Sequence, residues 1–181
     1  MAVSKIDFNC PSCSKKNRIK IKNVFSNEEI TDIIDRSIFK VKCTKCEKET
    51  TLDYPFTYIC DDYIIYYNME DTIEDNKTKR ICKTYDDVKE KLLIFNDNLN
   101  DVVIEYIKLF IESELKKEKV FTEVRYDSLI NNELRFYVIN KKEYANISLD
   151  FYHDLLSKGK LKEIKGAAII DANTCLKYFH L

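Results

Sequence analysis

The fold is decided by two four-residue stretches near the start of the chain, Cys10-Pro11-Ser12-Cys13 and Cys43-Thr44-Lys45-Cys46. Each stretch holds two cysteines separated by two residues, and a tight turn can point both thiols to the same side. A structural zinc ion takes four ligands in a tetrahedron, most often thiolate sulfur. Each stretch can supply half of such a site. The sequence therefore predicts one zinc ion bound by Cys10, Cys13, Cys43 and Cys46.

The alternatives to a metal site are disulfide bonds or four unrelated thiols. The chain has seven cysteines, and this odd number is awkward for an oxidised framework. Residues 1–8 lack the apolar segment of a signal peptide. Both observations favour zinc and a reducing, cytoplasmic location. Four thiolates would leave no open coordination position for water, so the zinc is expected to be structural, and Cys60, Cys82 and Cys175 are expected to be buried thiols.

The residues around the cysteine pairs fit metal-binding turns unevenly. Pro11 presets φ to about −65° early in the first turn. A glycine often follows the second cysteine of such turns because a positive φ is convenient there, but Ser14 and Glu47 occupy these positions. The interval 14–42 is longer than usual and has room for a strand, a helix and another strand.

Hydrophobic periodicity predicts a β-rich first part of the chain. Strands are expected at 5–9, 18–22, 38–42, 52–60 and 63–67, and a helix at 28–36 capped by Ser26 or Asn27. The aromatic residues from Tyr54 to Tyr67 could stack on bases. Their alternation with period two, with Leu52 and Cys60 on the same face, favours a hydrophobic core instead.

The rest of the chain predicts helices followed by a second β segment. A polar loop is expected at 70–79, helices at about 84–95 and 101–117, a hairpin with Asn131-Asn132 at its tip, a helix at 149–157 ended by Gly159, and a strand at 167–170. The helix at 101–117 is apolar on more than one face. It is either sandwiched inside the fold or offered to another subunit, and we favour the sandwich, with the hairpin as its cover.

These elements predict an α+β protein that is a monomer or weak homodimer. The three expected segments are a zinc-ribbon-like antiparallel β module (1–69), a linker with a helical pair (70–119), and a C-terminal hairpin, helix and strand (120–181). No apolar run reaches about 18 residues, so no membrane span is expected.

A basic strand follows the first cysteine pair and is the candidate site for nucleic acid. Its basic residues are Lys15, Lys16, Arg18, Lys20 and Lys22. Residues 1–50 hold eleven basic and seven acidic side chains, a local excess that could follow a phosphate backbone. The simpler interpretation is a solvated strand face, because the whole chain has a net charge of −1 and would not steer nucleic acid from a distance.

The composition gives little support to an enzyme. Only two histidines, His153 and His180, and two glycines are present, and no nucleophile motif or phosphate-binding loop occurs. Asp61-Asp62 is better explained as a turn than as a pair of catalytic carboxylates.

The order of the motifs resembles the CpXC family. The first cysteine pair, the second pair, the stretch Leu52–Tyr58 and the segment Tyr85–Phe95 followed by Leu99-Asn100-Asp101 are all similar to that family, over about the first 120 residues. The second pair departs from it, since Thr44 replaces the usual proline. The resemblance implies zinc binding through the four cysteines and no established biochemical activity. We therefore expect a non-catalytic, zinc-stabilised protein that binds another protein or acts as a scaffold.

Overall fold

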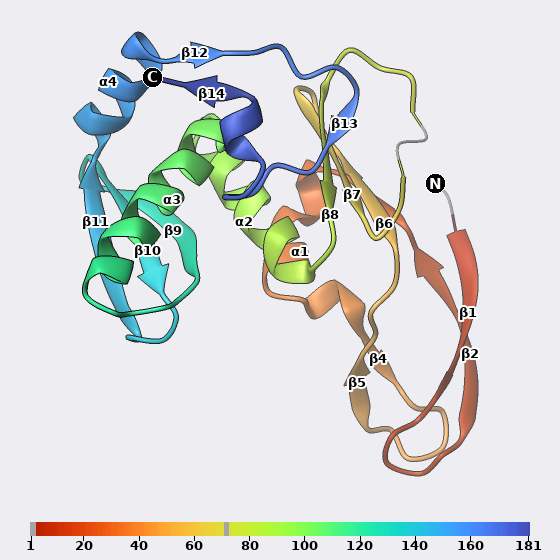
Figure 1. Ribbon diagram of the computed structural model, residues 1–181. Helices are drawn as coiled ribbons and strands as arrows, with labels where there is room; N and C mark the ends of the chain where they lie inside the picture. Colours follow the sequence, from red (N-terminus) through yellow and green to blue (C-terminus); the bar gives the residue numbers. More distant parts are fainter. Residues whose placement is uncertain (1–2, 71–72) are drawn as a thin grey trace. The chain divides into compact units, whose positions relative to one another are not determined.

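The computed structural model describes residues 3–70 and 73–181. The chain divides into two compact units, Met1–Tyr85 and Asp86–Leu181, which are described separately (Figure 1). Both helices and strands are present, which confirms the α+β class. No helix among the described residues is long and apolar enough to cross a membrane.

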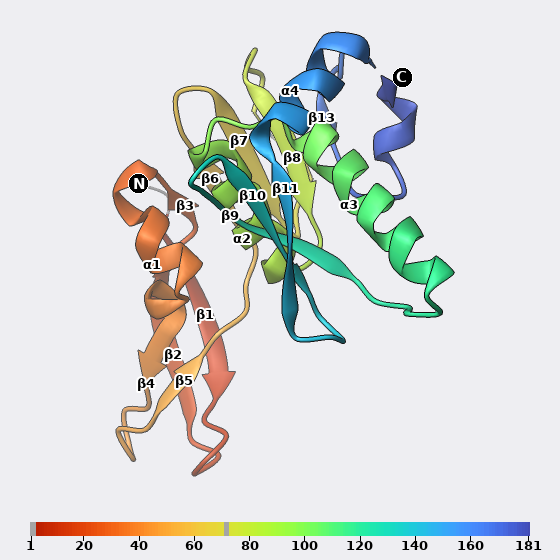
Figure 2. The ribbon, with the colours of Figure 1, turned by 90° about the vertical axis from the view of Figure 1, so that its left-hand side faces the viewer.

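Two hairpins carry the cysteine pairs of the first unit. Strands β1 (Val3–Asn9) and β2 (Lys16–Lys22) pair antiparallel, and so do β4 (Lys40–Lys42) and β5 (Glu49–Thr51). Their turns lie at the same end of the unit in both views (Figures 1 and 2).

The predicted helix at 28–36 is wrong in its length. The structure has a 3-10 helix (Asn27–Glu29), α1 (Ile30–Ile34) and a second 3-10 helix (Ser37–Phe39). Ser26 is the N-cap and forms a capping box with Glu29, whose Oε2 accepts from the Ser26 N–H at 2.9 Å. Arg36 has a φ of 64°, a left-handed conformation that ends the helical run early.

A sheet of β3 (Val24–Phe25), β6 (Phe56–Ile59), β7 (Tyr63–Tyr67) and β8 (Thr78–Cys82) forms the core of the first unit, in the order β8-β7-β6-β3. Phe56, Tyr58 and Tyr66 are at most 1% exposed, which confirms the aromatic stretch as core. The strand predicted at 52–60 is shorter than expected, beginning only after Pro55, a residue that has no N–H to donate.

Strand β8 begins at Thr78 and so corrects the end of the loop predicted at 70–79, of which residues 71 and 72 lie outside the described residues. The strand is mostly buried although its sequence is polar. Lys79 and Arg80 are 6% and 5% exposed, and each donates to a backbone carbonyl, Lys79 to Ile73 and Arg80 to Lys79 itself. A basic side chain can be buried when it has hydrogen-bond partners such as these. Hydrophobic periodicity counts every basic residue as solvent-exposed, so it does not predict this strand.

The second unit places helices against a three-stranded antiparallel sheet. The helices are α2 (Tyr85–Asn96), α3 (Asp101–Lys117) and α4 (Leu149–Lys158), and the strands β9 (Val124–Ile130), β10 (Glu133–Val138) and β11 (Glu143–Ser148) lie in the order β11-β10-β9. Short strands β12 (Lys160–Leu161), β13 (Ala167–Ala168) and β14 (Phe179–His180) and a 3-10 helix (Cys175–Lys177) complete it. The hairpin tip is confirmed, since Asn131 and Asn132 have φ values of 51° and 63°. Strand β11 was not predicted.

Helix α3 is internal, as predicted. It packs on β9, on α4 and on the C-terminal segment, and Val103, Ile104 and Ile107 are fully buried. Asn100 caps its start by accepting from the N–H groups of Val102 and Val103 at 3.0 and 3.3 Å.

A chain of buried ion pairs joins α2, α3 and β9. Lys91 Nζ lies 3.3 Å from Asp101 and 2.8 Å from Glu105. Lys108 Nζ lies 2.9 Å from Glu105 and 2.8 Å from Glu90, and Arg125 continues the chain from Glu90 at 3.1 Å. Each of these charges therefore lies beside an opposite one, which offsets the cost of burying it.

Candidate metal centre

The two cysteine turns have the same backbone conformation. The N–H of Ser14 donates to Cys10 O at 2.8 Å, and the N–H of Glu47 donates to Cys43 O at 3.0 Å. Ser14 and Glu47 both have a φ of 57°. The residue after each second cysteine is therefore left-handed, the conformation for which glycine is the usual choice.

Ser14→Gly and Glu47→Gly should each stabilise the metal-bound protein. A left-handed conformation destabilises the folded state by about 1–2 kcal/mol when the residue has a side chain. Glycine avoids this strain but loses about 0.5–1 kcal/mol of stability, because its unfolded chain has more conformational entropy. We expect a net gain of up to about 1 kcal/mol, measured by chemical denaturation of the metal-loaded protein. Ser12→Gly, at an exposed position of the first turn without a positive φ, serves as the control and should not stabilise. A loss of stability in both variants would contradict the strain argument.

The four predicted ligands come together at the end of the hairpins. Their sulfur atoms all lie within 4.8 Å of one another. The Cys10 and Cys46 Sγ atoms are 3.6 Å apart, and so are those of Cys13 and Cys43. A disulfide would need about 2.05 Å, and all seven cysteines are free. A tetrahedron with metal–sulfur bonds of about 2.3 Å has edges of roughly 3.8 Å, so the donor set fits a zinc-sized tetrahedral ion.

Asn17 supports the cluster and was missed by the sequence analysis. It is 3% exposed. Its Nδ2 donates to Lys15 O at 2.8 Å and lies 3.6 Å from Cys43 Sγ, while its Oδ1 accepts from the N–H and hydroxyl of Thr44 at 3.0 and 2.8 Å. Asn17 thus ties the second cysteine turn to the first hairpin. The sequence did contain a signal for its burial. Asn17 lies two residues before Ile19 in a strand with period two, so both side chains are on the inner face.

The surroundings of Cys43 and Cys13 shift the pKa values of the two thiols in opposite directions. The backbone N–H groups of Cys46 and Lys45 and the Asn17 amide lower the pKa of Cys43 to about 6. The backbone at Lys15 favours the Cys13 thiolate, but burial and the adjacent cysteine sulfurs outweigh it and raise the pKa of Cys13 to about 11. Four thiolates this close repel one another, and a bound divalent cation would relieve that repulsion.

A family model described as CpXC protein matches residues 6–108, more than half of the chain. The chain belongs to the CpXC family. The match contains both cysteine turns of this CpXC protein, the aromatic strands and the start of α3. No curated protein and no solved structure matched the chain.

The basic strand of the CpXC protein does not present five free cations. Lys16 and Arg18 lie 3.2 and 3.1 Å from Asp7. Lys22 pairs with Glu29, whose pKa is lowered: burial opposes this, but Lys22 and the Ser26 N–H outweigh it. Lys15 and Lys20 are exposed. The positive charge of the strand is therefore partly compensated.

Lys20→Gln and Lys22→Gln should differ in their effect on stability. Lys20 is exposed, so its loss should change the free energy of unfolding by no more than about 0.5 kcal/mol. Lys22 has a half-buried partner, and its loss should cost about 1.5 kcal/mol, the lower end of the range for a hydrogen bond to a charged group. Chemical denaturation of the two variants measures the difference. Equal, negligible effects would show that the Lys22–Glu29 pair contributes nothing.

The other three cysteines do not belong to the cluster. Cys82 and Cys175 are 2% and 0% exposed, as predicted for buried thiols, whereas Cys60 is half-buried and lies 3.5 Å from Tyr63 O. Burial, reinforced by the charge of Glu105, raises the pKa of Cys175 to about 11. A raised pKa disfavours the thiolate that a nucleophile or a metal ligand requires.

Proposed function

We propose that the four cysteines hold one structural zinc ion, and that this CpXC protein is a non-catalytic module that binds another protein or serves as a scaffold. The observation that carries the proposal is the set of four sulfurs within 4.8 Å of one another. Four thiolates complete a tetrahedron, so the zinc would have no open position for substrate or activated water. The role of the metal is then to fold the surface that a partner contacts.

The hairpins need such a metal. Strands β4 and β5 have three residues each, and an isolated short hairpin is at best marginally stable in water. Zinc bound between the turns would join the two hairpins and would contribute its binding free energy to folding. The seven free thiols also suit a reducing compartment, and we place the protein in the cytoplasm.

Metal analysis of the purified full chain tests the proposal. We expect one zinc per chain, and chelation should remove ordered structure from residues 3–51 while amide signals of residues 86–181 stay unchanged. A well-folded, metal-free protein would exclude the structural zinc site.

Nucleic-acid binding by the basic strand is the second interpretation, and the ion pairs to Asp7 and Glu29 do not favour it. A mobility-shift assay with mixed DNA and RNA at increasing salt separates the two, because phosphate contacts weaken steeply with salt. Salt-sensitive binding that Lys15→Gln with Lys20→Gln abolishes would favour nucleic acid over a protein partner.

A further inference from the structure

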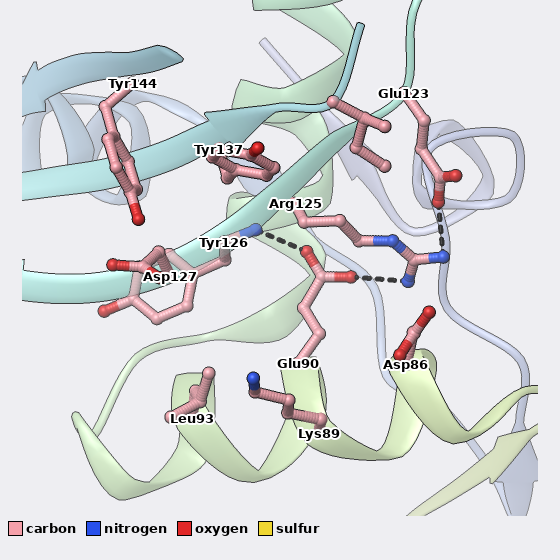
Figure 3. A pocket seen from close by; sticks show the side chains of 11 residues that line it. Asp86, Lys89, Glu90, Leu93, Glu123, Arg125, Tyr126, Asp127, Tyr137 and Tyr144 are labelled. Carbon is pink, nitrogen blue, oxygen red and sulfur yellow. Dashed lines mark hydrogen bonds and ion pairs between the residues drawn. The ribbon is translucent and has the colours of Figure 1, made fainter. Parts of the chain in front are cut away.

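A pocket of about 380 Å³ opens in the second unit, between α2 and the outer side of the β9-β10-β11 sheet (Figure 3). Helix α2 supplies one wall, and side chains of the three strands supply the other. The volume lies within the usual range for a small-ligand site. None of the lining residues belongs to the cysteine cluster, so the pocket is a separate candidate site.

The Arg125 guanidinium in the pocket wall already forms ion pairs with carboxylates of the protein. Arg125 Nη1 lies 2.8 Å from Asp87 Oδ1 and 3.1 Å from Glu90 Oε2, and Nη2 pairs with Glu123. Glu90 also accepts from the N–H of Tyr126 at 2.6 Å, so this part of the wall is fixed. A ligand anion would have to compete with these carboxylates for Arg125.

The remaining charges of the pocket are predominantly negative. Its lining holds four carboxylates and two basic side chains. Within the described part of the chain, neither Asp86 nor Asp127 has a basic side chain at ion-pair distance, although Asp127 accepts from the Ser128 hydroxyl at 2.8 Å. Lys89 is the remaining base. Asp86 and Asp127 therefore outnumber Lys89, and the part of the pocket that Arg125 does not occupy keeps an excess of negative charge.

Two tyrosines complete the pocket, and one of them already contacts a cationic side chain of the protein. Tyr137 and Tyr144 are cross-strand partners on β10 and β11, with ring centroids 5.3 Å apart. The Arg135 guanidinium lies 4.0 Å from the centroid of the Tyr144 ring. Tyr144 is nevertheless 46% exposed, which leaves ring surface for a second cation.

We propose that this pocket binds a small organic cation, a protonated amine or a guanidinium on a short apolar chain. Asp86 and Asp127 would neutralise the charge, and the tyrosine rings would cover the apolar chain. The same chemistry is present in a free metabolite and in a lysine or arginine side chain of a protein.

An NMR titration of the full-length protein tests the proposal with n-butylguanidinium and with the blocked peptide acetyl-Gly-Arg-Gly-amide. Saturable shift changes confined to the pocket are expected, whereas butyrate should cause none. Tighter binding of n-butylguanidinium indicates a free metabolite, and tighter binding of the peptide indicates a protein side chain. Absence of saturable binding with both cations would overturn the proposal.

Variants then test the sign of the charge. Asp86→Asn and Asp127→Asn should each weaken binding by about two- to five-fold, as should Tyr144→Leu through loss of the ring. Asp150→Asn on α4, away from the pocket, should leave the affinity unchanged. Lys89→Gln removes the competing cation and should strengthen binding. Weaker binding in Lys89→Gln would overturn the proposal by showing that the pocket selects negative charge.

Discussion

Cys43→Ser should release the metal and unfold the hairpins of the first unit. A structural zinc ion contributes about 10–16 kcal/mol of apparent binding free energy at neutral pH, which is as large as the whole stability of an ordinary domain, about 5–15 kcal/mol. Cys43 is also the sulfur whose pKa the Cys46 and Lys45 N–H groups and the Asn17 amide lower to about 6, which favours the thiolate that a metal requires. We expect zinc content to fall from one per chain to near zero and amide dispersion to be lost from residues 3–51.

Cys10→Ser should reproduce this loss, because each cysteine turn supplies half of the tetrahedron. The matched control is Cys60→Ser, a half-buried thiol of the same unit that lies outside the cluster. It should keep its zinc and its spectrum. Full zinc occupancy in Cys43→Ser and Cys10→Ser would show that the four sulfurs are not the ligands, whatever their separation.

The cluster of four cysteines could be predicted from the sequence because each pair is specified by residues close together in the chain. Two cysteines separated by two residues fix the turn, and positions 14 and 47 were recognisable as places that need a positive φ. The partnership between Asn17 and Thr44 was not predictable in the same way. It depends on how two hairpins meet, and residues 27 positions apart carry no shared pattern in the chain.

Burial of charge explains most of what the sequence analysis missed. The start of strand β8 was assigned to a loop because Thr78 and Lys79 resemble solvated residues, and the rest of the strand was given no assignment. Helix α3 was correctly placed inside the fold, but Asp101, Glu105 and Lys108 on that helix are 1–5% exposed. Their spacing of four and three residues puts them on one stripe of the helix. A single sequence cannot distinguish such a buried stripe of charges from a solvent-exposed helix face, unless the oppositely charged residues on α2 are known.

Lys108→Met should destabilise the second unit by about 3–5 kcal/mol, the usual cost of removing one partner from a buried ion pair. The ammonium lies 2.8 Å from Glu90 and 2.9 Å from Glu105, and its side chain is 7% exposed. Methionine fills the same volume but leaves Glu105 with Lys91 alone. Amide hydrogen exchange of residues 86–181 measures the loss, and zinc content should not change.

Lys117→Met is the matched control on the same helix. Lys117 pairs with Glu114 at 2.6 Å, but the two side chains are 67% and 49% exposed. Its loss should therefore change stability by no more than about 0.5 kcal/mol. Equal effects of the two substitutions would show that the buried chain of charges contributes no more than a surface pair.

The stabilisation by Lys108 should persist to alkaline pH. Burial alone would lower the pKa of Lys108, but Glu90 and Glu105 outweigh burial and raise it. A raised pKa in the folded state means that the stabilisation is fully present below the unfolded value of about 10.4 and is lost as pH rises through the folded value. The stability difference between the natural protein and Lys108→Met should thus stay constant from about pH 7 to 9 and shrink only above about 10.4. A difference that already vanished by about pH 9 would mean that the folded protein holds Lys108 with a lowered pKa, and that desolvation rather than ion pairing dominates at this site.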